Sequence, residues 1–310
     1  MAVNCPVCEA PVLAGDSFCE ACGQRLDAPA CAGCGAPAVD ADGYCERCGL
    51  RQPTGRDHAE IELPGGAAGV TDKGLRRARN EDAMALLSTG TATVAVVCDG
   101  VGSSPRADEA SAVAVETAAA ALARGAPARE AFELAGRAVT KLASSVDHAP
   151  ACTYVSAVVT GGEITISWAG DTRAYWLPAG EPLATDDTRP VGEPLTTDDT
   201  RPVGAPPAAD GTEPTGEPLT EDDAAPTGEI TAWLGADAGD VEPRVRTLTP
   251  AGPGLLLVCS DGLWRYLGGY AFPRSGTPLE MARAMLRHAL DSGGQDNVTI
   301  VLIPLGGPHG

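Results

Sequence analysis

Apolar residues in this chain gather into short runs without alternation. The clearest are VAVVC at 94–98, GLLLVC at 254–259 and VTIVLIP at 298–304. Such runs are typical of strands buried on both faces, because a half-buried strand alternates apolar and polar positions. From 70 to 178 the pattern predicts strand, strand, helix, helix, strand, strand, with alanine-rich helices at 106–124 and 127–146 and the later strands at 151–159 and 163–170.

Acidic residues stand at the ends of the three apolar runs. Asp99-Gly100 and Asp261-Gly262 follow the first two runs, and Asp296 precedes the third. Taken singly, an Asp-Gly pair is a common turn dipeptide. Acids at strand ends can also converge on one point, and a following glycine lets the backbone approach a ligand closely. Hard divalent cations prefer oxygen ligands, and two of them about 3.5 to 4 Å apart can hold a phosphoryl group and activate water.

The order of these acidic segments resembles the metal-dependent serine/threonine protein phosphatases of the protein phosphatase 2C (PPM) family, bacterial type. The resemblance covers about 68–305 without an insertion, through TDKGLRRARNEDA (71–83), VAVVCDGVGSSPRADEAS (94–111), ACTYVSAVVTGG (151–162), ISWAGDTRAYWL (166–177), ITAWLGAD (230–237), LLLVCSDGLW (255–264) and GGQDNVTIVLI (293–303). It implies an α+β fold, a four-layer αββα sandwich of two antiparallel sheets flanked by helices. It also implies hydrolysis of phosphoserine and phosphothreonine by water that two or three Mn²⁺ or Mg²⁺ ions activate.

The same resemblance assigns metal roles to five positions. It implies that Asp99 bridges both ions and that the Gly100 carbonyl binds one of them. Asp261 and Asp296 are expected to complete the protein ligands of the other ion. Asp171, in the segment AGDTR, matches the acid that holds a third, weaker metal together with Asp261 in bacterial members.

Catalytic roles are implied for the segment RARNED. Glu81 and Asp82 match acids that act in the metal shell largely through water. Arg77, four residues before Glu81, matches the arginine that holds the substrate phosphate, and a guanidinium suits this task because it offers a bidentate fork. Arg76 and Arg79 lie beside it, so a merely solvated basic cluster is the alternative.

Two further positions shape this expectation. Val101 stands where several eukaryotic members have a histidine that protonates the leaving alcohol, so a water would have to supply that proton. Asn297 is expected to support the Asp296 loop by hydrogen bonding rather than to bind metal. None of the metal aspartates of the family pattern is lost.

Eight of the eleven cysteines form four Cys-x2-Cys pairs before residue 49. Two such pairs complete a tetrahedral Zn²⁺ site, and the alternative is a disulfide framework. The sequence shows no signal-like apolar segment before them, which favours two structural zinc ions. The expected sets are Cys5, Cys8, Cys19, Cys22 and Cys31, Cys34, Cys45, Cys48. Cys98, Cys152 and Cys259 sit in apolar runs and are interpreted as buried small hydrophobes.

These segments predict the domain organisation. We expect a double zinc ribbon at 1–50, a linker at 51–69 that can also start the first strand, and a catalytic domain at 70–306 with an acidic insertion at 180–227. The insertion repeats with a period of twelve, and residues 181–229 hold 13 acidic side chains against two arginines. Rich in proline and poor in aliphatic residues, it is expected to form a disordered or extended loop, with LTEDDA at 219–224 matching a family segment.

Net charge and hydropathy limit the kinds of partner that the chain can bind. A net charge of −20 opposes nucleic-acid binding, although zinc ribbons often contact nucleic acid. No apolar run approaches the roughly 20 residues that span a bilayer, so a cytoplasmic protein is expected. The expected partners are a phosphorylated protein substrate and a serine/threonine kinase counterpart, without nucleic acid or membrane. The alternative function is a catalytically weak, phosphatase-like adaptor that recruits a protein partner through the zinc ribbons.

Overall fold

The computed structural model describes residues 3–5, 8–13, 16–23, 26, 31, 34–39, 44–49, 55–146, 148–179 and 216–306. The chain divides into two compact units, Met1–Asp57 and His58–Gly310. Of the acidic insertion, residues 180–215 lie outside the described residues, and so does the expectation that they are disordered or extended.

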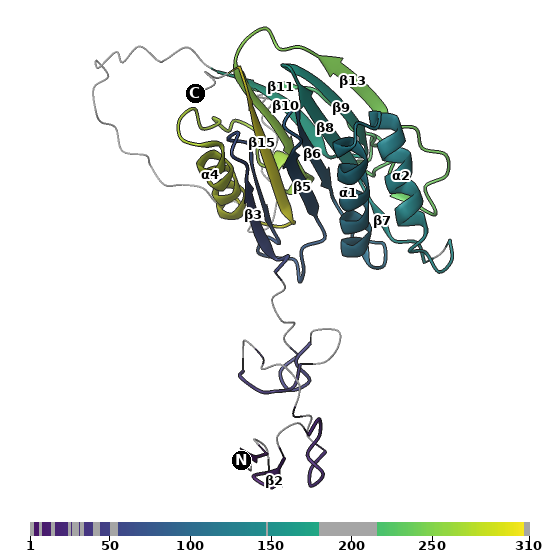
Figure 1. The fold of residues 1–310 in the computed structure, drawn as a ribbon, viewed down its shortest axis with the longest axis vertical. Helices are drawn as coiled ribbons and strands as arrows, with labels where there is room; N and C mark the ends of the chain where they lie inside the picture. Colours follow the sequence, from purple (N-terminus) through teal and green to yellow (C-terminus); the bar gives the residue numbers. More distant parts are fainter. Residues whose placement is uncertain are drawn as a thin grey trace, which may run out of the picture. The chain divides into compact units, whose positions relative to one another are not determined.

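Two antiparallel sheets form the centre of the larger unit (Figure 1). The six-stranded sheet has the order β11-β10-β14-β15-β4-β3, and the five-stranded sheet has the order β13-β9-β8-β6-β5. The strands of the first are β3 (His58–Glu62), β4 (Ala68–Asp72), β10 (Arg173–Pro178), β11 (Glu217–Pro218), β14 (Gly254–Cys259) and β15 (Val298–Leu305). Those of the second are β5 (Ala83–Ser88), β6 (Ala92–Cys98), β8 (Tyr154–Thr160), β9 (Glu163–Ala169) and β13 (Arg244–Leu248). A short pair, β7 (Ala151–Cys152) with β12 (Leu234–Gly235), lies outside both sheets.

Helices cover the outer face of each sheet. Figure 1 shows α1 (Ala107–Ala123) and α2 (Ala128–Thr140) on one side of the sheets and α4 (Pro278–Asp291) on the opposite side. The short helix α3 (Asp261–Trp264) follows β14 directly. The layers are therefore helix, sheet, sheet, helix, which confirms the αββα sandwich. No helix among the described residues is both long enough and apolar enough to cross a membrane.

The alternation of side chains along β6 explains its uninterrupted apolar run. Val94 and Val96 pack under α1 and α2, whereas Ala95 and Val97 face the core between the two sheets. A strand with helices on one face and a second sheet on the other needs apolar residues at every position. The central strands β14 and β15 are buried on both faces in the same way, so the three apolar runs are confirmed as buried strands.

The first strand begins within the 51–69 segment, an option that the sequence left open, and one helix is shorter than expected. Strand β3 pairs with β4 from His58 to Glu62. Its sequence HAEIE has few apolar residues because it is an edge strand that is only partly buried. Helix α2 ends at Thr140 instead of extending to 146. After Thr140 the Leu142 N–H donates to the Val139 carbonyl, three residues back, and this tighter turn ends the helix.

The last copy of the acidic repeat packs within the larger unit. Strand β11 pairs with β10, and Leu219 is buried in the core between the sheets. Asp222 accepts two hydrogen bonds from Arg173, at 2.8 and 2.7 Å. The segment 219–224, which the sequence singled out among the copies, therefore belongs to the packed domain.

Candidate active site

The loops that carry the candidate residues meet at one end of the sandwich. In the six-stranded sheet, Cys259 at the end of β14 pairs with Arg173 at the start of β10. In the five-stranded sheet, Cys98 at the end of β6 pairs with Ala83 at the start of β5. The β4–β5 and β9–β10 connections cross between the sheets at this same end. Antiparallel registers thus bring together segments that are far apart in the sequence.

Buried negative charge is concentrated around Asp99. Burial raises the pKa of Asp99 well above its usual range, and the charges of Asp82, Asp261, Asp296 and Asp171 raise it further. These five acids come from five separate segments of the chain. The charged form of a carboxylate near four other carboxylates in a partly buried site is destabilised unless bound cations neutralise the negative charge.

Asp82 is the most enclosed of these acids, with 3% of its surface exposed. Its Oδ2 accepts hydrogen bonds from Ser260 Oγ and Thr299 Oγ1, each at 2.7 Å. Burial raises the pKa of Asp82 to about 7 although these two hydrogen bonds act in the opposite direction. Sequence reasoning missed both hydroxyl donors. The available signal was that Ser260 directly precedes Asp261 and that Thr299 lies three residues after Asp296, both at the ends of buried strands.

Asp261 and Asp171 form a second part of the acidic group. Asp261 opens α3, and its Oδ2 lies 2.6 Å from Arg265 Nη2. Burial is the main cause that raises the pKa of Asp261, and burial together with the charge of Asp261 raises the pKa of Asp171 to about 6. Trp264 Nε1 donates to the Asp171 carbonyl at 2.8 Å, and the Arg173 guanidinium lies 3.5 Å from the Trp264 ring centre. This stack fixes the two acidic loops beside each other.

Two oxygens in the acidic group fit a bound cation. Asp82 Oδ1 and Asp261 Oδ1 are buried and have no hydrogen-bond partner among the described residues. Such an oxygen is costly to bury unless a donor or a cation satisfies it. Among the described residues, no three of the acidic side chains bring their oxygens within 4.8 Å of one another. The fit to a hard divalent cation therefore rests on the chemistry of the donors, which are carboxylate oxygens of the kind that Mg²⁺ and Mn²⁺ prefer.

Asp99 and Gly100 are held by their backbone. The Asp99 N–H donates to Thr153 Oγ1 at 3.0 Å, and the Thr153 N–H donates to the Asp99 carbonyl at 2.8 Å. The Gly100 N–H donates to the Glu81 carbonyl at 3.1 Å. A Cβ at position 100 would lie 2.8 Å from that carbonyl oxygen and 2.9 Å from Ala107, so only glycine fits.

Arg77 lies at the edge of the acidic group. Its Nη2 donates to Asp296 Oδ2 at 2.7 Å, and a Cβ placed on Gly102 would lie 3.1 Å from its Nη1. Its guanidinium therefore lies between the Asp296 loop and the loop that follows Asp99. Arg79 instead pairs with Asp108 at 3.2 Å. The surroundings favour Arg77 over Arg79 as the residue that meets a phosphate.

Asn297 ties the loops of the site together. Its Nδ2 donates to the carbonyls of Lys73 and Arg79, each at 2.9 Å, and its Oδ1 accepts from the Glu81 N–H at 2.8 Å. Asn297 was expected to support the Asp296 loop by hydrogen bonding, and its side chain does form hydrogen bonds, but with the β4–β5 loop. The whole β4–β5 loop, including Arg77, is thereby fixed to the start of β15.

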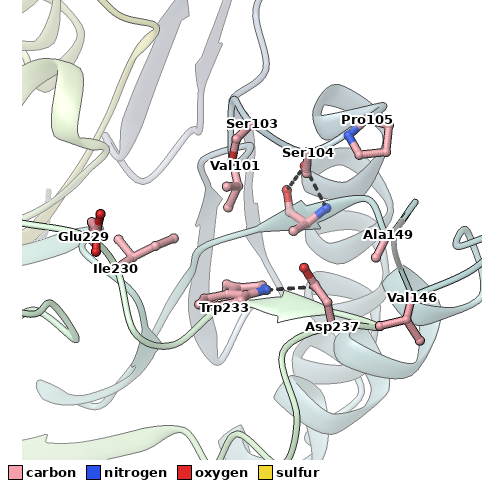
Figure 2. A pocket seen from close by; sticks show the side chains of 11 residues that line it. Val101, Ser103, Ser104, Pro105, Val146, Ala149, Glu229, Ile230, Trp233 and Asp237 are labelled. Atoms are coloured by element: carbon pink, nitrogen blue, oxygen red, sulfur yellow. Dashed lines mark hydrogen bonds between the residues drawn. The ribbon is translucent and has the colours of Figure 1, made fainter.

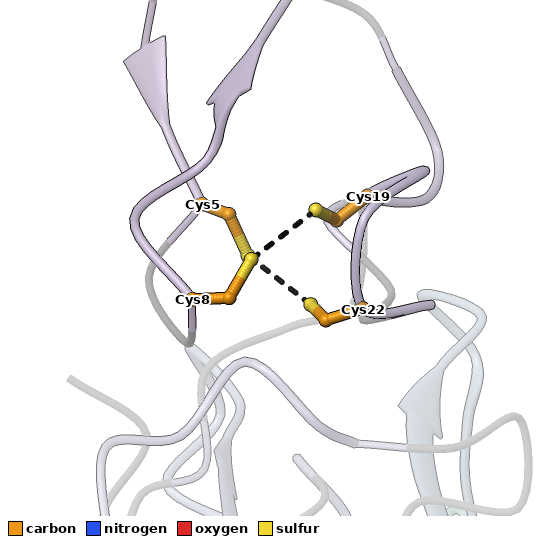
Figure 3. A group of neighbouring side chains, drawn as sticks. All are labelled: Cys5, Cys8, Cys19 and Cys22. Carbon is orange, nitrogen blue, oxygen red and sulfur yellow. Dashed lines mark hydrogen bonds between the residues drawn. The ribbon is translucent and has the colours of Figure 1, made fainter.

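The smaller unit contains two groups of four cysteines, one of which is drawn in Figure 3. In each group the ligand sulfurs all lie within 4.8 Å of one another, and paired sulfurs are 3.6 to 3.7 Å apart. A disulfide bond is about 2.05 Å long, whereas sulfurs about 2.3 Å from one zinc ion lie about 3.8 Å apart. The predicted sets are confirmed, and they fit two structural zinc ions: Cys5, Cys8, Cys19, Cys22 and Cys31, Cys34, Cys45, Cys48.

The residue after each cysteine pair has a left-handed backbone conformation. Gly23, Gly35 and Gly49 have φ between 71° and 73°, and Glu9 has φ 60° at the equivalent position. Each donates its N–H to the carbonyl of the first cysteine of its pair, which closes the turn. Glycine adopts this conformation without strain, so Glu9 is the one strained member of the four. Strand β1 (Val3–Asn4) pairs with β2 (Pro11–Val12) around the first turn.

Cys98, Cys152 and Cys259 in the larger unit are fully buried, as expected. Burial raises the pKa of the Cys98 thiol well above its usual range, which keeps it protonated. These three cysteines therefore act as small apolar residues that fill the core.

A two-sheet sandwich whose end gathers buried acids, orphaned carboxylate oxygens and an arginine defines a metal-dependent phosphatase site. The family model described as protein phosphatase 2C matches residues 75–295, and the model described as double zinc ribbon matches residues 5–49. Since the first match covers more than half of the chain, the chain belongs to the protein phosphatase 2C family. It is a metal-dependent protein phosphatase, and the adaptor alternative is not favoured.

Solved structures of bacterial phosphatases have the same fold. The serine/threonine phosphatase Stp1 from Staphylococcus aureus is 21% identical, with a TM-score of 0.61, 82% of this chain covered and 100% of that one. MsPP from Mycobacterium smegmatis, a PPM Ser-Thr phosphatase in complex with cacodylate, is 25% identical, with a TM-score of 0.54, 77% of this chain covered and 98% of that one. The catalytic domain of PstP in complex with two manganese ions is 22% identical, with a TM-score of 0.54, 76% of this chain covered and 96% of that one. A comparison with curated proteins gave no match.

Proposed function

We propose that this chain hydrolyses phosphoserine and phosphothreonine in proteins. Asp99, the Gly100 carbonyl, Asp261 and Asp296 hold two Mn²⁺ or Mg²⁺ ions, and Arg77 binds the phosphoryl group. The observation that carries this proposal is the convergence of buried acids on Asp99, two of which keep an oxygen without a hydrogen-bond partner. The PstP catalytic domain, which has the same fold and was solved in complex with two manganese ions, supports the binding of two such ions.

Three further acids complete the site. Asp171 holds a third, weaker ion together with Asp261, an assignment that the electrostatic influence of Asp261 on Asp171 supports. Glu81 and Asp82 act in the metal shell largely through water. The orphaned Oδ1 of Asp82 supports this role, because its other oxygen is already occupied by two hydroxyl donors.

When bound, the ions supply positive charge to the phosphoryl group and lower the pKa of water. The oxygen of a water attacks phosphorus, the bond from phosphorus to the serine or threonine oxygen breaks, and inorganic phosphate leaves. Arg77 neutralises phosphoryl oxygens through its two-pronged guanidinium, which Asp296 holds in place. Thr153 fixes the backbone of Asp99. Since Val101 cannot give a proton, a second water protonates the leaving alcohol.

The substrate is a phosphoprotein, so a serine/threonine kinase must act before this enzyme. We propose that such a kinase is its counterpart. A cytoplasmic location is also proposed, because eight free thiols in two zinc-binding groups are best preserved in a reducing compartment.

The decisive experiment is hydrolysis of p-nitrophenyl phosphate and of a phosphothreonine peptide by wild type and Asp99→Asn, with Mn²⁺ and with EDTA. We expect Mn²⁺-dependent turnover that EDTA abolishes and that Asp99→Asn lowers at least about 100-fold. Tryptophan fluorescence shows whether both proteins are folded. Absence of turnover in folded, Mn²⁺-loaded wild type would refute the proposal.

A further inference from the structure

A pocket of about 400 Å³ opens beside the catalytic loop (Figure 2). Val101 and Ser104, which follow Asp99 and Gly100 in sequence, form one wall. Trp233 and Ile230 line the opposite side, with the Glu229 carboxylate at one end and the Asp237 carboxylate beside Trp233. None of these residues has a role in the site described above. Val101 entered the argument only because it stands where several eukaryotic members have a proton-donating histidine.

The wall of this pocket is rigidly connected to the catalytic centre. The Val101 N–H donates to the Ala151 carbonyl at 3.0 Å, and the Ala151 N–H donates to Ser104 Oγ at 3.1 Å. Gly100 forms a bridge with the next residue, Cys152. The loop that carries Asp99 therefore runs directly into the pocket wall. A Cβ placed on Gly102 in this loop would lie 3.1 Å from Arg77 Nη1, so a phosphate held by Arg77 would bring the neighbouring substrate residues close to the pocket.

The lining favours a long side chain with an apolar stem and a cationic head. The Trp233 ring is held by a hydrogen bond of 3.0 Å from its Nε1 to Asp237 Oδ1. An indole face binds guanidinium and ammonium groups, while Val101 and Ile230 offer apolar contact to the methylene stem. Among the described residues that line the pocket, two are carboxylates and none is Lys, Arg or His. The nearby Arg106 is already paired with Glu109, with Nε 2.9 Å from Oε1.

We propose that this pocket is a specificity subsite that binds an arginine or lysine side chain of the phosphoprotein substrate, close in sequence to the phosphorylated residue. The proposal rests on the proposed phosphatase function and adds the class of substrate sequence. The acidic lining excludes acidic side chains by repulsion, so the pocket also selects against substrates with acidic flanks.

The test compares phosphothreonine peptides that carry Arg, Leu or Glu at each position next to the phosphothreonine. For wild type with Mn²⁺ we expect kcat/KM to be about tenfold higher for the best Arg peptide than for its Glu counterpart. Glu229→Lys should remove or reverse this preference, and Trp233→Ala should reduce it. Neither variant should change hydrolysis of p-nitrophenyl phosphate. Glu163→Lys, the same charge change at the exposed β8–β9 turn, is the matched control and should behave as wild type.

Other outcomes overturn the proposal. Equal kcat/KM for the three peptide types, a preference for Leu, or an unchanged preference in Glu229→Lys each shows that the pocket does not select a basic side chain. Failure of p-nitrophenyl phosphate hydrolysis would refute the phosphatase function instead. In that event, fluorescence anisotropy of the same labelled peptides on wild type and Glu229→Lys still tests the pocket, because it measures binding without turnover.

Discussion

Replacing Asp82 by asparagine should stabilise the metal-free protein at alkaline pH while it weakens metal-dependent activity. The side chain is buried, one oxygen has no hydrogen-bond partner, and burial raises its pKa to about 7. Asparagine has nearly the same shape and can still accept from Ser260 and Thr299. It carries no charge, so the cost of burying an anion disappears.

The magnitude follows from proton linkage. An aspartate in an unfolded chain has a pKa of about 3.9, whereas Asp82 in the folded protein has a pKa of about 7. Because the folded state holds the proton more tightly, protonation stabilises the fold at low pH. This stabilisation is lost as the pH rises through about 7. Between pH 5.5 and 8.0 the loss from this one group is on the order of 2 kcal/mol.

The assay is urea unfolding in EDTA at pH 5.5 and at pH 8.0, followed by tryptophan fluorescence. All four tryptophans lie in the larger unit, so loss of zinc from the smaller unit does not enter the signal. We expect wild type to be less stable at pH 8.0, Asp82→Asn to lose about 2 kcal/mol less, and Mn²⁺ to restore stability mainly in wild type. Wild type whose stability in EDTA rises with pH, or a variant with the same pH dependence, would refute the reasoning.

Three further predictions concern single positions. Gly100→Ala should lower kcat at least about 100-fold and destabilise the fold by about 2 kcal/mol, because the added Cβ would clash with the Glu81 carbonyl. Gly252→Ala is the control, since the space around its Cβ is open, and it should change neither kcat nor stability. Arg77→Ala should lower kcat/KM for a phosphopeptide by a factor that corresponds to about 1.5 to 3 kcal/mol of lost phosphate binding, and Arg77→Lys should recover only part of this loss. Equal kcat/KM of wild type and both variants would contradict a phosphate-binding role. Glu9→Gly should stabilise the first cysteine group by about 1 kcal/mol by removing left-handed strain, seen as slower zinc release to a chelator, and faster release would contradict it.

Local chemistry explains why much of the site was predictable from the sequence. Two cysteines in a Cys-x2-Cys pair are close in space because one tight turn joins them, so the zinc-binding sets needed no knowledge of the fold. The aspartates proposed to bind metal were recognisable for a similar reason, since Asp99, Asp261 and Asp296 stand at the ends of buried apolar runs. The twelve-residue repeat was equally visible, and only Leu219 and Asp222 of its last copy showed that this copy packs onto the domain.

What the sequence by itself indicated is the set of proposed ligands: the carboxylates, the arginine and the thiolates. The tertiary structure alone decided how they are held. Asp82 meets Thr299 across 217 positions, and Arg77 meets Asp296 across 219. Strands buried on both faces have no alternation that reveals their register, so no sequence pattern predicts such partners. The pocket between Val101 and Trp233 has the same origin, because only antiparallel packing brings the two segments together.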